Sequence, residues 1–204
     1  GCDLTGNHDV SMFPNLGTSF LVYTNPNLTS ITHTPSTQTF SLYLVSSNNL
    51  TGNHDMSGLS GLGGQFWIYN NPLLTSITHT ASTQTFSQYY AYSCGLTGNH
   101  DMSGLSGLGG VFHIAINPLL TSITHTTSTE VFTQYYAFSC DLTGNHDMSG
   151  LKALGGIFQI QTNPLLKIII NPQSTETFTT YDARGCDLDY INFLPLSGAT
   201  FVGA

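Results

Sequence analysis

Apolar and polar positions alternate along this chain with a fixed period. An asparagine or cysteine recurs every 23 residues, and we call this position n. Two such turns make a 46-residue unit, because Leu4, Leu50, Leu96, Leu142 and Leu188 are each 46 residues apart. A period of this size is typical of a solenoid. The n positions are Cys2, Asn25, Asn48, Asn71, Cys94, Asn117, Cys140, Asn163 and Cys186.

Each turn carries a short strand pattern just before n. Phe and Tyr alternate at n−5, and Val, Ile or Ala stands at n−3. Because successive side chains on a strand point to opposite faces, n−5 and n−3 are expected to face the core, and n−4 and n−2 to face outward. The inward residues are Phe20, Tyr43, Phe66, Tyr89, Phe112, Tyr135, Phe158 and Tyr181 at n−5, and Val22, Val45, Ile68, Ala91, Ile114, Ala137, Ile160 and Ala183 at n−3.

This spacing, L-x-L-x-x-N/C-x-L, resembles the leucine-rich repeat family over nearly the whole chain. The chain departs from that family by placing aromatics at many leucine positions, and Gly at n−8 in alternate turns. We expect a β-rich solenoid with one parallel sheet of about eight short strands and few or no helices. The Asn or Cys at n should turn inward and hydrogen-bond the backbone of the bend. The segments between strands lack a helical period and are expected to be loops, with at most short 3₁₀ or extended pieces.

The period also bears on the cysteines. Adjacent strands lie roughly 4.8 Å apart, so residues two turns apart are separated by nearly 10 Å. A disulfide needs Cα atoms within about 7 Å. Cys94, Cys140 and Cys186 are therefore expected to be buried thiols, and the four cysteines do not indicate an oxidising compartment.

The ends of the repeat suggest a division of the chain. Residues 1–186 should form about eight turns, and residues 187–204 an irregular C-terminal turn or cap with a final strand at Phe201 and Val202. A solenoid end exposes core and unpaired strand edge unless it is covered. One functional hypothesis is therefore a structural extracellular protein that self-associates through uncapped ends and stacks into a fibre or surface layer.

Comparison of the repeats with one another indicates a different hypothesis. Residues 50–95 and 96–141 are nearly identical, yet their strand segments read QFWIYNN and VFHIAIN, and the third copy reads IFQIQTN. The inward Phe and Ile do not change, whereas the outward positions do. The segments NHDMSGLSGLGG and NPLLTSITHT are identical in both copies, although drift after duplication should alter loops as well.

The outward positions form a surface rich in aromatic residues. Contiguous exposed apolar surface usually marks an interaction site, and Tyr, Trp and Arg often carry binding energy. We therefore expect a non-enzymatic recognition module that binds a protein or glycan; the alternative is that aromatics simply favour strands. The expected ligand-binding residues are Tyr23, Leu44, Gln65, Trp67, Tyr69, Tyr90, Tyr92, His113, Tyr136, Phe138, Gln159, Gln161, Asp182 and Arg184.

Composition narrows the class of partner. The 204 residues include three Lys and Arg against eleven Asp and Glu, for a net charge of −8. So few cations argue against nucleic acid and anionic membrane surfaces, and no apolar run reaches the roughly 20 residues of a membrane helix. Surface polarity from Ser, Thr and Asn suits an extracellular or cell-surface protein, with potential glycosylation sequons at Asn27 and Asn49.

Catalytic and metal chemistry are not expected. Identical histidines two turns apart are too distant to share a zinc ion, so the NHD triplets are interpreted as turns that bond their own backbone. No Ser, His and Asp set is singular enough to indicate a nucleophilic site. The Gly-Gly pairs such as Gly109-Gly110 lack the Lys of a phosphate loop and are interpreted as tight turns into a strand. We expect no cofactor.

Overall fold

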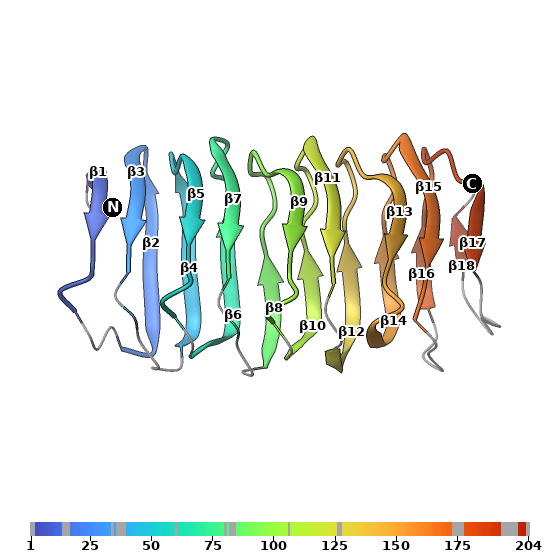
Figure 1. The fold of residues 1–204 in the computed structure, drawn as a ribbon, viewed down its shortest axis with the longest axis horizontal. Helices are drawn as coiled ribbons and strands as arrows, with labels where there is room; N and C mark the ends of the chain where they lie inside the picture. The colour runs from blue at the N-terminus through green and yellow to red at the C-terminus, as the bar shows by residue number, and fades with distance from the viewer. Residues whose placement is uncertain are drawn as a thin grey trace.

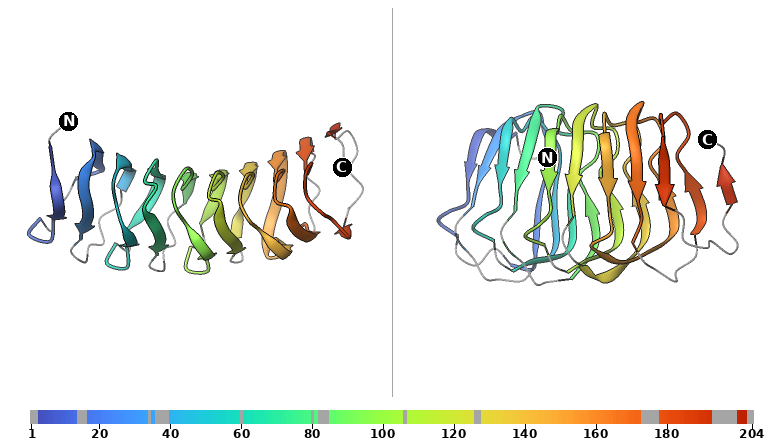
Figure 2. Two further views of the ribbon diagram at one scale, coloured as in Figure 1. Left: turned by 90° about the horizontal axis from the view of Figure 1, so that it is seen from above. Right: turned by 45° about the vertical axis from the view of Figure 1, so that its right-hand side comes forward.

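The computed structural model describes residues 3–13, 17–33, 35, 40–59, 61–79, 81, 85–105, 107–125, 128–172, 178–192 and 200–202. In this part the chain is a parallel β-solenoid without helices. Figure 1 shows the turns side by side along the long axis, and Figure 2 shows that the strands lie in two layers. No helix in the described residues has the length and apolar character needed to span a bilayer.

The even-numbered strands form one continuous parallel sheet, which we call the main sheet. Its strands contain the n−5 to n−3 pattern, and each pairs with the strand of the next turn, as Tyr89 does with Phe112. It has nine strands because Thr200–Val202 adds one beside the eighth. They are β2 (Ser19–Asn25), β4 (Phe40–Asn48), β6 (Leu62–Tyr69), β8 (Phe86–Tyr90), β10 (Leu108–His113), β12 (Ser128–Tyr136), β14 (Leu151–Gln159), β16 (Phe178–Asp182) and β18 (Thr200–Val202).

The odd-numbered strands form the second layer, which we call the opposite face. These segments were expected to be loops with at most short extended pieces; the extended pieces are in fact paired strands that form a layer. The LTSIT segments bury apolar residues such as Leu74 and Ile77 and pair in parallel with TGNHD segments, and in the last pair LLKIII takes the place of LTSIT. The strands are β1 (Thr5–Asp9), β3 (Asn27–Thr32), β5 (Gly52–Asp55), β7 (Leu74–Thr78), β9 (Thr97–Asp101), β11 (Leu119–Thr124), β13 (Thr143–Asp147), β15 (Leu165–Ile170) and β17 (Tyr190–Asn192).

The second layer also explains why the segments between main-sheet strands are identical in neighbouring units. NHDMSGLSGLGG contributes Met56, Leu59 and Leu62 to the core, and NPLLTSITHT contributes Leu74 and Ile77. These segments are therefore identical for reasons of packing as well as any surface role, because adding or removing even one methylene in a core changes its stability.

A ladder of Asn and Cys side chains at position n hydrogen-bonds the backbone at the corner between the two layers, as predicted. Asn117 Nδ2 donates to the carbonyl of Ala91 at 2.9 Å, and its Oδ1 accepts the backbone N–H of Cys94 at 3.1 Å. In the next turn the Cys140 thiol makes a longer contact, 3.7 Å, with the carbonyl of Ile114. Residue n−1 is left-handed in seven consecutive turns, with φ between 51° and 59°, which bends the chain out of the main sheet.

The prediction for the described cysteines is confirmed. Cys94, Cys140 and Cys186 are free thiols; Cys94 and Cys140 are buried as expected, whereas Cys186 is only half-buried. Burial raises the pKa of Cys94 to about 12 and that of Cys140 to about 11, so both are protonated and unreactive at neutral pH. Cys2 lies outside the described residues.

The centre of the core is a column of stacked aromatic rings. The alternating Phe and Tyr side chains at n−5 follow one another with ring centroids 4.7–5.5 Å apart, from Phe20 to Tyr181. This distance is close to the roughly 4.8 Å between hydrogen-bonded strands. The sheet spacing therefore places each ring in contact with both neighbours.

The Gly-Gly pairs lie near the start of β6 and β10, as expected, but within β14, which begins at Leu151. Gly110 has φ +63°, and a Cβ placed there would lie 2.2 Å from the carbonyl oxygen of Ser87 in the preceding turn. Gly64 and Gly156 have the same conformation and the same close approach. Side chains are excluded here both by φ and by the neighbouring backbone.

Substitution of Gly110 should therefore destabilise the protein more than substitution of a glycine that is constrained by φ alone. Gly98 has φ +64°, and a Cβ placed there would have no heavy atom within 4 Å, so it is a matched control. Gly98→Ala should cost about 1–2 kcal/mol for the left-handed conformation, and Gly110→Ala a further ~1–3 kcal/mol for overpacking. Equal losses in urea unfolding would contradict the close approach.

Candidate functional site

The predicted outward residues lie on the outer surface of the main sheet. Seven of them carry rings and are neighbours across four successive strands. They come from β6, β8, β10 and β12 and from the residues that directly follow β8 and β12. We call this group the aromatic cluster: Trp67, Tyr69, Tyr90, Tyr92, His113, Tyr136 and Phe138.

The rings of the cluster stack along the solenoid axis. Tyr92 lies between Tyr69 and His113, at centroid distances of 4.8 Å and 4.4 Å and interplanar angles of 4° and 17°. In the other row, Trp67 stacks on Tyr90 at 5.6 Å and 10°. Tyr69 and Tyr92 at n−2, like Trp67 and Tyr90 at n−4, are one turn apart, so the strand spacing that orders the core rings also orders these pairs. His113 is at n−4 and stacks on Tyr92 across the two rows.

This stacking determines which parts of the rings reach solvent. All seven side chains are half-buried, since they cover one another. A ring stacked on both sides, as Tyr92 is, presents its edge and hydroxyl outward and not its face. Polar atoms at the edge are also oriented: Trp67 Nε1 donates to Gln88 Oε1 at 3.1 Å, and the Tyr136 hydroxyl donates to Gln134 Oε1 at 3.2 Å.

His113 occupies the middle of the cluster and is uncharged at neutral pH. Burial lowers the pKa of its imidazole to about 4. It also contacts Tyr90, at 5.7 Å and 78°, and Tyr136, at 5.1 Å. Its Nε2 is buried without a hydrogen-bond partner among the described residues. The cluster therefore contains no charged side chain.

The remaining predicted residues flank the cluster. On the N-terminal side Tyr23 is 49% exposed and Leu44 is half-buried. Gln65, Gln159 and Gln161 are half-buried on the same surface.

Asp182 differs from the other predicted residues, because it is only 3% exposed. Its carboxylate accepts two hydrogen bonds from Arg184, at 3.0 Å from Nε and 2.8 Å from Nη2. These bonds lower the pKa of Asp182. Asp182 therefore orients the exposed Arg184 guanidinium and does not itself present a contact surface.

A repeated polar cluster in the core was not predicted from the sequence. The hydroxyl of Tyr43 lies 2.7 Å from Nε2 of His33 and 2.8 Å from Nε2 of His54. Since a hydroxyl has one hydrogen, it donates to one imidazole and accepts from the other. The same arrangement recurs twice, in His79, Tyr89 and His100, and in His125, Tyr135 and His146.

The signal for these clusters is present in the sequence. Tyr occupies n−5 only in alternate turns, and in three units a histidine stands ten residues before it and another eleven residues after it. In the last unit both histidines change together, to Asn171 and Asn192 around Tyr181. Burial raises the pKa of Tyr181, and a hydrogen bond with Asn171 offsets part of that rise.

The NHD triplets are thus only partly the backbone turns that were predicted. Asp55 accepts the backbone N–H of Ser57 at 2.8 Å, as a turn-forming Asp should. The preceding His54, however, points into the core instead of bonding its own turn. In the described part of the chain, no three His, Cys, Asp or Glu side chains form a group that could hold a metal ion.

Comparison of the sequence with protein-family models and curated proteins, and of the fold with solved structures, gives no match.

The buried histidines should make folding sensitive to acid. Burial lowers the pKa of His33, His100 and His146 to about 4 and that of His54 to about 3. In the unfolded chain these groups regain a pKa near 6.5. Between about pH 6.5 and 4 the unfolded state therefore binds more protons, so stability is full above this range and falls within it.

Each buried histidine should contribute a loss of up to about 1.4 kcal/mol per pH unit in that range. Urea unfolding from pH 7.5 to 4.5 measures the slope. The variant His125→Asn/His146→Asn, which copies the last unit of the chain, should have a slope smaller by two protons. A slope that is the same in both proteins would show that these histidines do not control the acid response.

Proposed function

We propose that this chain is a non-enzymatic recognition module that binds a protein through the aromatic cluster. The observation that carries this proposal is the continuity of the cluster: seven ring side chains in contact across four strands, none of them charged. Covering such a surface removes apolar area from water without the cost of desolvating a charge.

The geometry favours a protein over a glycan as the partner of this surface. On an aromatic surface, sugars stack on the open face of a ring, whereas Tyr92 has both faces covered and Trp67 has one face covered. Ring edges and tyrosine hydroxyls combine apolar area with hydrogen bonding and have few rotatable bonds. Protein interfaces are enriched in these side chains for that reason.

The sequence variation between units supports the same surface. The outward residues Trp67, His113 and Gln159 occupy equivalent positions in three successive units, while the Phe that precedes each is unchanged. A scaffold that keeps its core and varies its outer strand face can alter specificity without altering the fold.

We further propose that the chain is a member of the leucine-rich repeat family that acts outside the cell. The Asn and Cys ladder at the end of each main-sheet strand supports this membership. The extracellular assignment rests on a surface made polar by Ser, Thr and Asn and on the two sequons, of which Asn27 is exposed and Asn49 half-buried.

A second candidate function is self-association by stacking of turns. The edge position and the exposed side chains of β2 favour it. This strand is outermost in the described main sheet and carries Leu21 and Tyr23, which are 51% and 49% exposed. If stacking occurs, sedimentation velocity should show concentration-dependent assembly that Leu21→Lys/Tyr23→Lys suppresses, because edge lysines block strand pairing. A monomer at all concentrations would exclude this function.

The recognition proposal is tested by the triple variant Trp67→Ala/Tyr90→Ala/Tyr136→Ala. The probes are a displayed library of extracellular protein domains and a glycan array. A domain bound by the parent should bind the triple variant at least a hundredfold more weakly, since anchor residues each contribute about 2 kcal/mol or more. The control is Thr51→Ala/Thr97→Ala/Thr143→Ala, at exposed positions on the opposite face.

Folding of both variants is checked by circular dichroism and thermal unfolding. Retained domain binding in a folded triple variant would contradict the proposal. So would binding to glycans alone through the cluster, or the absence of any bound domain.

A further inference from the structure

The opposite face is interrupted at regular intervals, unlike the main sheet. Its strands pair as β1-β3, β5-β7, β9-β11 and β13-β15-β17. No strand pairing joins β3 to β5, β7 to β9 or β11 to β13 in the described residues. At every second junction between turns, the neighbouring strands of the opposite face are therefore unpaired, although single backbone hydrogen bonds such as Thr51 N–H to the Thr29 carbonyl still cross it.

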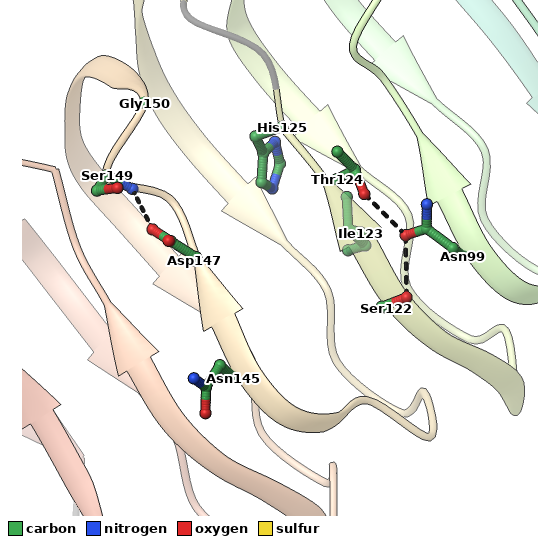
Figure 3. A pocket seen from close by; sticks show the side chains of 9 residues that line it. All are labelled: Asn99, Ser122, Ile123, Thr124, His125, Asn145, Asp147, Ser149 and Gly150. Carbon is green, nitrogen blue, oxygen red and sulfur yellow. Dashed lines mark hydrogen bonds between the residues drawn. The ribbon is translucent and has the colours of Figure 1, made fainter.

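The groove between β11 and β13 contains a hollow of about 500 Å³. Asn99, Ser122 and Thr124 line one side, and Asn145, Asp147 and Ser149 line the other. Figure 3 shows these side chains around the hollow, with His125 between the two strands. The volume is within the range of about 300–1,000 Å³ found for small-ligand sites.

The polar groups of the groove are held in place by bonds along its walls. Asn99 Oδ1 accepts the hydroxyls of Ser122, at 2.9 Å, and Thr124, at 3.1 Å. Asp147 Oδ1 accepts the backbone N–H of Ser149 at 2.9 Å. The carboxylate has a second oxygen, each hydroxyl has lone pairs, and the amide of Asn99 has N–H groups, so these walls can still donate and accept.

His125 lines this groove, and one of its ring nitrogens is buried beneath it. Its Nε2 is bonded to Tyr135, while Nδ1 is buried without a partner in the described part of the chain. The equivalent atoms of His33 and His79 are also buried without partners. Depending on the tautomer, Nδ1 either donates or accepts one hydrogen bond. A hydroxyl group of a ligand can bond either tautomer, because a hydroxyl can both donate and accept a hydrogen bond.

The residues that line this groove recur at two further junctions, β3/β5 and β7/β9, at a fixed spacing. The positions of Asn99, Ser122, Thr124 and His125 are occupied by the same residue types one and two units earlier, as are those of Asn145, Asp147 and Ser149. Units are two turns apart, which corresponds to roughly 10 Å. The row ends in the last unit, where Ile168 and Ile170 replace Ser122 and Thr124 and β15 pairs with β17.

We propose that these three grooves bind successive segments of one linear, uncharged polysaccharide. The walls offer hydroxyls, amides, a carboxylate and a neutral imidazole, which together match a ligand rich in hydroxyl groups. They contain a carboxylate and no cation, which disfavours polyanions. Three identical weak sites in a row bind a polymer far more tightly than a monomer, because the second and third contacts are intramolecular.

Affinity electrophoresis in gels containing soluble mannan, dextran or xyloglucan tests this site, with alginate as a polyanion. Parent protein should be retarded by at least one neutral polymer and not by alginate. The principal variant carries Ser→Ile and Thr→Ile at Ser30, Thr32, Ser76, Thr78, Ser122 and Thr124, a change that the last unit already contains. It should lose at least a hundredfold in affinity, and the same change in one groove alone about tenfold.

A milder variant guards against loss of folding. Asp55→Asn/Asp101→Asn/Asp147→Asn keeps the oxygen that accepts the turn N–H but removes the charge, and should weaken binding about tenfold. The aromatic triple variant Trp67→Ala/Tyr90→Ala/Tyr136→Ala should bind the polymer like the parent, which separates this site from the proposed protein-binding surface.

Four results would overturn the proposal. They are no retardation by any neutral polymer, retardation unchanged in both groove variants, retardation lost only in the aromatic triple variant, and retardation abolished by EDTA. The last would assign the polymer to a bridging cation and not to direct contact with the grooves.

Discussion

Every feature of this protein depends on the distance between hydrogen-bonded strands. Parallel strands lie roughly 4.8 Å apart, and in a solenoid each residue type returns at that distance or at a multiple of it. Stacked aromatic rings are stable at nearly the same separation. Phe and Tyr at n−5 can therefore form one unbroken column through the core, and Tyr69, Tyr92 and His113 can form a second one on the outer face.

The same spacing accounts for the double repeat. A tyrosine in the core must hydrogen-bond its hydroxyl, and the corners of the main sheet already use the Asn and Cys ladder for backbone groups. Tyr89 meets this requirement with one histidine from each side, His79 and His100, which belong to the opposite face. The two histidines that bond one tyrosine come from two turns. The ring in the next turn is therefore Phe112, which has no polar atom and needs no hydrogen-bond partner. Hydrogen bonding thus turns a 23-residue period into a 46-residue one.

The sequence predicted the main sheet well because its strands contain the strongest periodic signal. Alternation at n−5 and n−3, and an Asn or Cys at n, specify which face is inward and where the chain bends. The opposite face was missed because TGNHD has no apolar alternation: its inward residue is a histidine, such as His100, which propensity assigns to the surface. Only the pairing of that histidine with a tyrosine in another turn makes the segment a strand. Such a contact between distant residues is visible in one sequence only as a coincidence of positions, such as the joint change to Asn171 and Asn192.

The two candidate sites differ in whether their residues vary from unit to unit or repeat. The outer face of the main sheet changes from Trp67 to His113 to Gln159 in successive units, so each unit offers a partner a different contact. The exposed residues of the opposite face, such as Asn53, Asn99 and Asn145, are the same in successive units until the last one. A surface without internal repetition can match an irregular partner at one register, as a folded protein requires. A surface that repeats every two turns matches a ligand with its own repeat, and a polymer can occupy it in several registers with similar energy. The two proposals therefore follow from one property of the solenoid, namely that its turns are equivalent in backbone, while their side chains vary from unit to unit on the main-sheet face and repeat on the opposite face before the last unit.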